Sequence, residues 1–301
     1  MHVYAPHALH ATTMYAVLGQ VFDEDGIPRS TAFTVDFTAC RHIDGTGLAM
    51  LYVLITHLQQ QHALVRFEIG TQLPNTLQVQ LEWLMDEQTT SDVFKSTAVN
   101  GRYWQFHRVP VAGYQDWFVR VFNNWMARKL YTSSLLVEPQ TQCLGGLLSN
   151  VSQHAGVDHM TVLFSWDEEV NNISFVVADA GPGIPSRVRR IWRTPCSDEV
   201  ALVKAVENGG QPGQCGPRGE GGLEKLLHAF VDQQIGKVEI SSAFGRLRCM
   251  MGTGGKVYKF EPAHAYLPGT LIAVHFSTRE MQRSSMFNEP AARTSFVFKQ
   301  V

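Results

Sequence analysis

An acidic residue ends one of the most apolar segments of the chain and is followed at once by glycines and prolines. Residues 172–178 are rich in β-branched and aromatic side chains, which predicts a buried strand, and the chain continues as Asp179-Ala-Gly-Pro-Gly-Ile-Pro. Gly181 and Gly183 allow positive φ and a close approach of the backbone, while the prolines stop the strand. A carboxylate in this position either caps the turn or reads a polar edge of a ligand.

A predicted helix places three further residues on one stripe. In the segment GGLLSNVSQHAG, Gly146, Asn150 and His154 are spaced by four residues. This stripe lies away from the apolar face, which is formed by Leu144, Leu147, Leu148 and Val151. The amide oxygen of Asn150 suits a hard cation. Taken alone, Asn150 could equally be solvated or tie down a loop.

Glycines are concentrated just before a later predicted helix, GLEKLLHAFVDQ. They occupy positions 209, 210, 213, 216, 219, 221 and 222. A glycine-rich segment that opens a helix offers free backbone N–H groups and the positive end of the helix dipole, an arrangement that binds phosphate. Such a loop can also be only flexible. Downstream, Gly269-Thr270 enters a late strand, where a hydroxyl can reach a ligand beside Asp179.

In this order, the four segments resemble the four boxes of the GHKL ATPase superfamily, which includes gyrase, Hsp90, MutL and the histidine kinases and extends to the anti-sigma serine kinases. The resemblance covers roughly residues 137–277, and DAGPGI and NVSQHA are its most specific parts. It implies that Asp179 accepts from the adenine amino group, directly and through water shared with Thr270, and that Asn150 holds Mg²⁺ against the triphosphate. The implied ATP-binding residues are Asn150, Asp179, Gly181, Gly183, Ile184, Gly219, Gly221, Gly222 and Thr270.

One position departs from the family pattern. In gyrase-like ATPases and anti-sigma kinases a glutamate four residues before the asparagine is the general base, and here that position is Gly146. Loss of a general base removes a factor of about 10²–10⁴ in rate unless another group replaces it. His154 and Glu220 are the candidate replacements, and Glu220 lies in the expected lid, residues 193–222. The resemblance therefore implies ATP binding, and it leaves open hydrolysis, transfer to protein or neither.

The amino-terminal part resembles the STAS domain of anti-sigma-factor antagonists. A strand predicted over residues 31–40 is followed by Asp44-Gly-Thr-Gly-Leu, a helix of regular apolar spacing and a second strand, ALVRFEI. Thr46 matches the phosphorylatable position of that family. A phosphate there would sit at a helix N-terminus, where the dipole favours it. The alternative role of Thr46 is a simple helix cap.

The chain divides into three expected parts. A STAS-like α/β domain covers residues 1–90 and includes a further helix in LQVQLEWLMD; a connector with a docking helix over residues 114–131 covers residues 91–136. A histidine-kinase-like ATPase domain, a Bergerat-type α/β sandwich, covers residues 137–301. Its last strands are predicted as GKVEISSA, RCMMG and GTLIAVHF, separated by breaks. The expected fold class is thus α+β and α/β.

Composition limits the function classes. A chain of 301 residues with 45% hydrophobic content can form about two domains with sizeable cores. A formal charge of −2 gives no global reason to expect nucleic-acid or membrane binding. No apolar window approaches the roughly 18 residues of a membrane span, and the first residues lack a signal-peptide pattern, so we expect a cytoplasmic protein. The cysteines and histidines show no metal-binding spacing.

Three functional hypotheses remain. The leading one is a cytosolic regulatory protein in signal transduction that binds ATP and Mg²⁺ and couples nucleotide state to binding of a protein partner or to homo-oligomerisation. The second is an anti-sigma-type serine/threonine kinase that phosphorylates Thr46 or the STAS domain of a partner. The third is a non-catalytic interaction protein whose nucleotide site has decayed.

Overall fold

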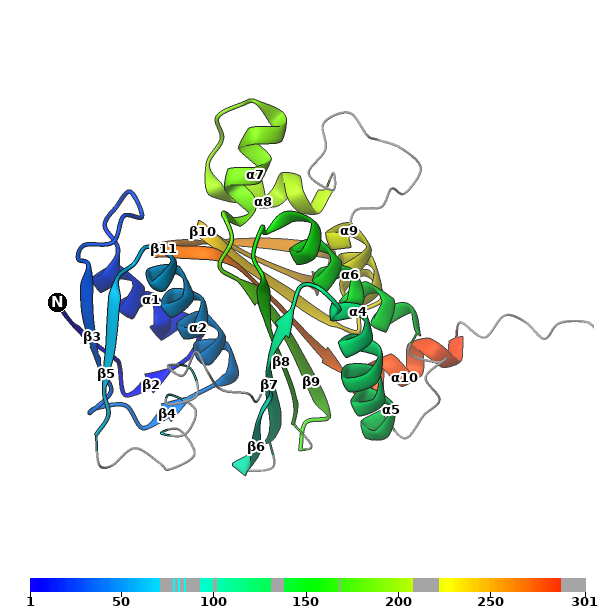
Figure 1. Ribbon diagram of the computed structural model, residues 1–301. Helices are drawn as coiled ribbons and strands as arrows, with labels where there is room; N and C mark the ends of the chain where they lie inside the picture. Colours follow the sequence, from blue (N-terminus) through cyan, green and yellow to red (C-terminus); the bar gives the residue numbers. More distant parts are fainter. Residues whose placement is uncertain are drawn as a thin grey trace, which may run out of the picture.

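The computed structural model describes residues 1–70, 78, 81, 84, 93–99, 102–130, 138–167, 169–207 and 222–287. Within them the chain forms an α/β protein with an N-terminal parallel sheet and helices, followed by a six-stranded antiparallel sheet packed with helices. Figure 1 shows the N-terminal unit on one side of the large sheet and a second helical layer on the other. None of the helices in these ranges is long and apolar enough to cross a membrane.

The N-terminal unit is a three-stranded parallel sheet in the order β1-β3-β5. Its strands are β1 (His2–Tyr4), β3 (Ala32–Asp36) and β5 (Leu64–Glu68), connected by α1 (Ala11–Val21) and α2 (Gly45–Gln60). Two short strands, β2 (Ala8–Leu9) and β4 (His42–Ile43), form a separate pair. The predicted strand–helix–strand unit is confirmed as β3, α2 and β5, and β1 and α1 complete it. The helix expected in LQVQLEWLMD lies mostly outside the described residues.

The six-stranded sheet has the order β10-β11-β9-β8-β7-β6. Its strands are β6 (Val93–Val99), β7 (Arg102–Pro110), β8 (His159–Asp167), β9 (Asn172–Asp179), β10 (Gly236–Gly252) and β11 (Gly255–Ser277). The three predicted final strands all lie in antiparallel strands, but the break expected between GKVEISSA and RCMMG was wrong, because both belong to the long strand β10, which forms a hairpin with β11. Shifts of register near Ala243 accommodate the irregularity that the sequence suggested as a break.

The segment expected to connect two domains instead contributes β6 and β7 to the large sheet. The helix expected after it runs over residues 114–130 as α4 (Tyr114–Trp117), the π-helical η1 (Phe118–Asn123) and α5 (Asn124–Leu130). Phe118, Phe122 and Met126 pack on the face of the sheet that is turned away from the N-terminal unit. This helix therefore covers the sheet and does not dock the two units against each other.

The remaining helices cover the same face of the sheet as α5 or follow its strands. Helix α6 (Glu138–His154) lies across the same face as α5, together with α9 (Gly222–Leu227) and the π-helical η3 (His228–Asp232). Helices α7 (Gly183–Trp192) and α8 (Asp198–Glu207) follow β9 and contact β10, and α10 (Thr278–Phe287) follows β11.

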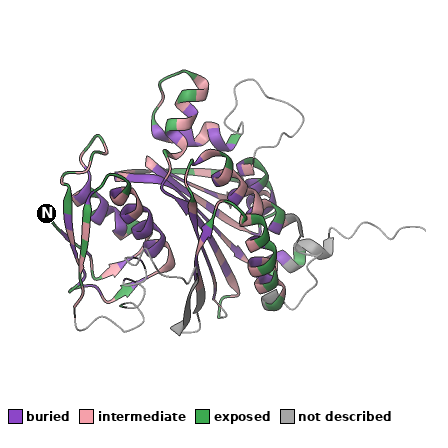
Figure 2. Ribbon diagram, in the orientation of Figure 1, coloured by how far each residue is buried: buried purple, intermediate pink, exposed green. Residues whose placement is uncertain are grey.

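Both faces of the large sheet are buried, as Figure 2 shows for its central strands. Val177, Ile272 and Phe175 face the helical layer, whereas Val176 and Ala273 face α1 and α2. Burial of both faces explains why β9 reads as an unbroken apolar run. The N-terminal unit therefore shares a continuous core with the sheet.

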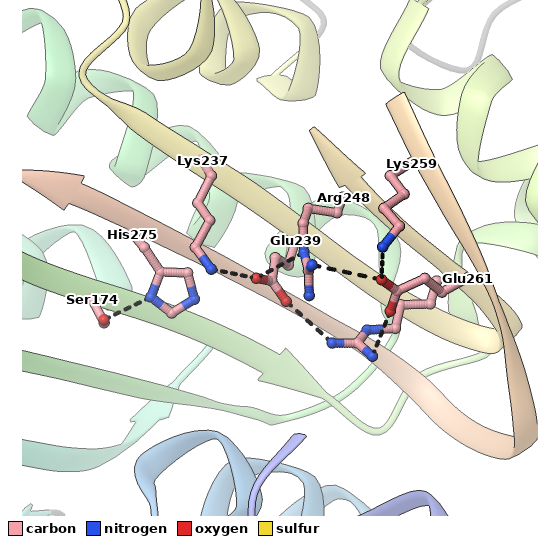
Figure 3. Close-up of polar contacts among 8 residues, drawn as sticks. Ser174, Lys237, Glu239, Arg248, Lys259, Glu261 and His275 are labelled. Atoms are coloured by element: carbon pink, nitrogen blue, oxygen red, sulfur yellow. Dashed lines mark hydrogen bonds and ion pairs between the residues drawn. The ribbon is translucent and has the colours of Figure 1, made fainter. Parts of the chain in front are cut away.

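A network of ion pairs holds the long hairpin together on the side of the N-terminal unit (Figure 3). The Glu239 carboxylate pairs with Lys237 at 2.8 Å, Arg248 at 3.3 Å and Arg246 at 3.4 Å, and Arg246 also pairs with Glu261 at 2.9 Å. Burial alone would raise the pKa of Glu239, but the hydrogen bond and charge of Lys237 and the other cations lower it to about 2. Glu239 thus stabilises the folded state as an anion.

We expect Glu239→Gln to lower the free energy of unfolding by about 2 to 3 kcal/mol at pH 7, since three cations would lose their shared counter-charge. Because the folded pKa is depressed, this contribution is present above the ordinary glutamate pKa and is lost as pH falls toward 2. Urea unfolding at several pH values measures it. Glu280→Gln, which removes one partner of the exposed Arg283–Glu280 pair, is the matched control and should change stability by less than about 1 kcal/mol. Equal effects of the two substitutions would contradict the expectation.

Candidate functional site

Three polar side chains form one row across neighbouring strands at the end of the large sheet. Asp179 on β9 pairs in register with Thr270 on β11, and Thr270 pairs with Ser242 on β10. All three residues are buried. Paired residues of antiparallel strands point to the same face, here the face covered by α6, α7 and α9. The structure thus brings Thr270 beside Asp179, as the sequence analysis expected, and adds Ser242.

Ser242 was missed from the sequence, although it is a polar residue at a core-facing position of an apolar strand. Its hydroxyl accepts a hydrogen bond from the Ile184 backbone N–H at 3.0 Å and donates one to the Gly269 carbonyl at 2.6 Å. It also lies 3.4 Å from the Thr270 hydroxyl. Ser242 therefore fixes the first turn of α7 to the strand that carries Thr270.

Asp179 is an under-satisfied buried carboxyl group. Its side chain accepts one hydrogen bond within the described residues, from the Gly181 backbone N–H to Oδ1 at 2.9 Å. The residue is only 6% exposed. Burial raises the pKa of Asp179 to about 6, against a smaller opposite effect of the Gly181 N–H. The carboxyl group keeps acceptor capacity for a further donor, which is what recognition of an amino group requires.

The glycines after Asp179 allow three elements to meet closely. A Cβ atom on Gly181 would lie 2.5 Å from the Ala155 carbonyl oxygen at the end of α6. Gly183 has φ +79°, and a Cβ atom there would lie 2.7 Å from the Ser242 hydroxyl. These glycines are required by packing within the protein itself. They fix the Asp179 turn against α6 and β10.

Asn150 lies on α6, on the same side of the sheet as Asp179. The apolar residues of α6 are buried as predicted, and the half-buried Asn150 forms no hydrogen bond within the described residues. A Cβ atom on Gly222 would lie 2.7 Å from Asn150 Nδ2, so the amide touches the first residue of α9. The structure thereby brings Asn150 to Gly222, where the glycine-rich segment meets α9.

The three residues of the α6 stripe occupy successive turns with different surroundings. A Cβ atom on Gly146 would meet no atom within 4 Å. At the other end, Nδ1 of His154 is buried and has no hydrogen-bond partner in the described structure. Burial lowers the pKa of His154; the Arg187 charge lowers it further, against an opposite effect of the Gln153 backbone. His154 directly precedes Ala155, so it lies at the Asp179 end of α6, whereas Gly146 lies at the middle of the helix, about two turns earlier.

The expected lid is only partly described, and its described part is packed. Helix α8 is held by the Arg189–Asp198 ion pair, and the Asp198 carboxylate also accepts the Phe244 backbone N–H at 2.8 Å. Side chains of α8 enter the core: Ala201, Leu202, Ala205 and Val206. Residues 198–207 of the expected lid are thus packed against β10, and ordering of the segment around a nucleotide stays a prediction. Gly219, Glu220 and Gly221 lie outside the described residues.

Thr46 is separated from these residues by the sheet. It lies in the first turn of α2, which packs on the opposite face, where a Cβ atom on Gly45 would lie 2.6 Å from the Leu163 side chain. The helix cap is Asp44, whose carboxylate accepts the Gly47 N–H at 2.7 Å. The alternative role of Thr46 as the cap was therefore wrong, and Asp44 has that role.

We expect Asp179→Asn to raise the free energy of unfolding of the ligand-free protein at pH 8 by about 2 to 3 kcal/mol, from a pKa shift of about two units. The folded pKa exceeds the unfolded value of about 3.9, so this contribution to stability is complete below pH 4 and is lost as pH rises through 6. The advantage of the asparagine variant should therefore grow between pH 4 and 6 and then level off. Urea unfolding between pH 4 and 8 measures it, with the exposed Asp158→Asn as control. A variant advantage that does not depend on pH would contradict the interpretation.

Comparison with protein-family models and with curated protein sequences found no relative of this chain. The chain matches no protein-family model, and no curated protein sequence is significantly similar to it. Its function is therefore inferred from the residues and their arrangement.

Proposed function

We propose that this chain is a cytoplasmic regulatory protein of the GHKL ATPase type that binds Mg·ATP and couples nucleotide state to binding of a partner. In this proposal the large sheet with α6, α7 and α9 is a Bergerat-type ATPase domain, and the N-terminal unit is STAS-like. Asp179 binds the adenine amino group with Thr270 beside it, and Asn150 holds Mg²⁺. The bound metal supplies positive charge against the phosphate chain.

The observation that carries the proposal is the state of Asp179. A buried carboxyl group with one hydrogen bond and a pKa near 6 destabilises the empty protein at neutral pH, and such groups are concentrated at binding and catalytic sites. Asn150 supports it independently, because its amide is half-buried, lies on the same side of the sheet and has no partner in the described structure. Neither feature is expected of a purely structural interaction protein.

The kinase alternative has less support. No carboxylate occupies the Gly146 position, and His154 lies at the Asp179 end of α6, about two turns from Gly146 in the middle of the helix. Thr46 lies across the sheet from Asn150, so transfer within one chain would require the N-terminal unit to leave its shared core. Slow hydrolysis or binding without turnover is the function that these positions favour.

Calorimetric titration of the full chain with Mg·ATP tests the proposal. We expect Asp179→Asn to weaken ATP binding about 10- to 100-fold, because the adenine amino group would lose its charged acceptor. Asn150→Ala should weaken Mg·ATP binding and leave adenosine binding unchanged. Asp158→Asn, an exposed change of the same chemistry, is the control and should bind as the unmodified protein does. Absence of any nucleotide binding, or near-normal affinity of Asp179→Asn, would refute the proposed function.

A second experiment concerns turnover. Gly146→Glu is expected to fold, since open space surrounds the position of its Cβ atom, and to raise the rate of phosphate release at least tenfold by supplying a general base one turn before Asn150. Gly146→Ala makes the same backbone change without a carboxylate and should leave the rate unchanged. A folded Gly146→Glu protein with the original rate would show that the base lies elsewhere.

A further inference from the structure

Two side chains near the Asp179 turn have polar groups without a partner within the described residues. Nδ1 of His154 is buried without a hydrogen bond, and Arg187 forms neither a hydrogen bond nor an ion pair within the described residues. Arg189 on the same helix is fully engaged by contrast, since it hydrogen-bonds the Cys196 carbonyl at 3.0 Å and pairs with Asp198. Within the described residues, the lack of a partner thus distinguishes Arg187 from Arg189.

The close packing of α6 on the Asp179 turn brings together the two helices that carry these side chains. Gly181 approaches the Ala155 carbonyl, so the last turn of α6 lies against the loop from which α7 starts. His154 ends α6, and Arg187 lies one turn into α7. The charge of Arg187 is felt by His154, and Arg187 in turn is close enough to Arg190 to feel its charge.

The charged groups on α7 near His154 are positive. Arg187 and Arg190 form no ion pair with a carboxylate of the described chain, and burial keeps His154 neutral at pH 7 by lowering its pKa. The Arg187 guanidinium, whose charge acts on His154, and an imidazole nitrogen without a partner in the described structure form a position that a bound anion would stabilise. A phosphate group matches both the fork of an arginine and a single imidazole hydrogen bond.

We propose that Arg187 and His154 bind the phosphate group nearest the ribose of the nucleotide. The inference rests on the proposed function, which places adenine at Asp179 and the metal at Asn150. Along α6, His154 lies one turn beyond Asn150, next to the loop that follows Asp179. The part of a nucleotide that passes this turn is the part between the base and the metal-bound phosphates, which comprises the ribose and the first phosphate.

Affinities for adenosine, AMP and ADP, measured by calorimetry on the full chain without Mg²⁺, test this assignment. We expect the unmodified protein to bind AMP more tightly than adenosine. Arg187→Ala should weaken AMP and ADP binding about tenfold and leave adenosine binding unchanged, as for loss of a charged hydrogen bond. Arg187→Lys should recover part of the loss, and His154→Ala should produce a smaller loss with the same ligand selectivity. Arg190→Ala removes the same charge from a more exposed position of α7 and should change each affinity less than twofold.

The outcomes separate this inference from the proposed function. If Arg187→Ala weakens adenosine as much as AMP, or if Arg190→Ala has the same effect as Arg187→Ala, the phosphate assignment is overturned while nucleotide binding stands. Equal binding of adenosine and AMP by the unmodified protein overturns it as well. If none of the three ligands binds, both the proposed function and this inference are refuted. Unchanged unfolding temperatures of the variants show that a loss of affinity is not a loss of fold.

Discussion

The position of Asp179 between two buried faces is the constraint on which the rest of the site depends. Its neighbours Ala178 and Ala180 pack in the core beneath α1 and α2, so the alternation of the strand turns Asp179 toward the opposite face. Gly269 on the adjacent strand comes so close that a Cβ atom there would collide with the Asp179 carbonyl oxygen. Together with these small residues, the Ser242 hydrogen bonds, which tie α7 to Gly269, hold the Asp179 turn in place.

Two carboxylates with little exposure to solvent, Glu239 and Asp179, lie in opposite electrostatic environments. Glu239 is surrounded by cations, which hold its pKa at about 2, so its charge stabilises the hairpin. Asp179 has no ion pair within the described residues, and burial raises its pKa to about 6. The same fold provides three cations for Glu239, and no described cation pairs with Asp179. The poor solvation of Asp179 is therefore a local feature of the row formed by Asp179, Thr270 and Ser242. A donor from a ligand would compensate it, which is the physical basis for placing recognition there.

Sequence patterns predicted the parts of this protein that depend on local rules. The apolar runs of β8 and β9, the amphipathic face of α6 and the Asp179 turn follow from periodicity and from the limited conformations of glycine and proline. The partners of β6 and β7, the length of the β10–β11 hairpin and the role of Ser242 depend on contacts between distant segments. Three further features have no local signature: the order of the strands, the face on which the helix of residues 114–130 packs, and the anchoring of α8 by Asp198. The sequence analysis assigned each of them incorrectly or not at all.

The shared core also limits how the site could influence the N-terminal unit. Because α1 and α2 pack directly on the back of β8, β9 and β11, the unit cannot move as a free domain without exposing residues such as Leu163, Val176 and Ala273 to water. A ligand at Asp179 would therefore act on the N-terminal unit over a short path, through the neighbouring residues Ala178 and Ala180. A shift of the turn toward a ligand would change the packing under α2, which lies on the same face of the sheet as Ala178 and Ala180. Regulation in this fold thus requires two alternative packings of a single core.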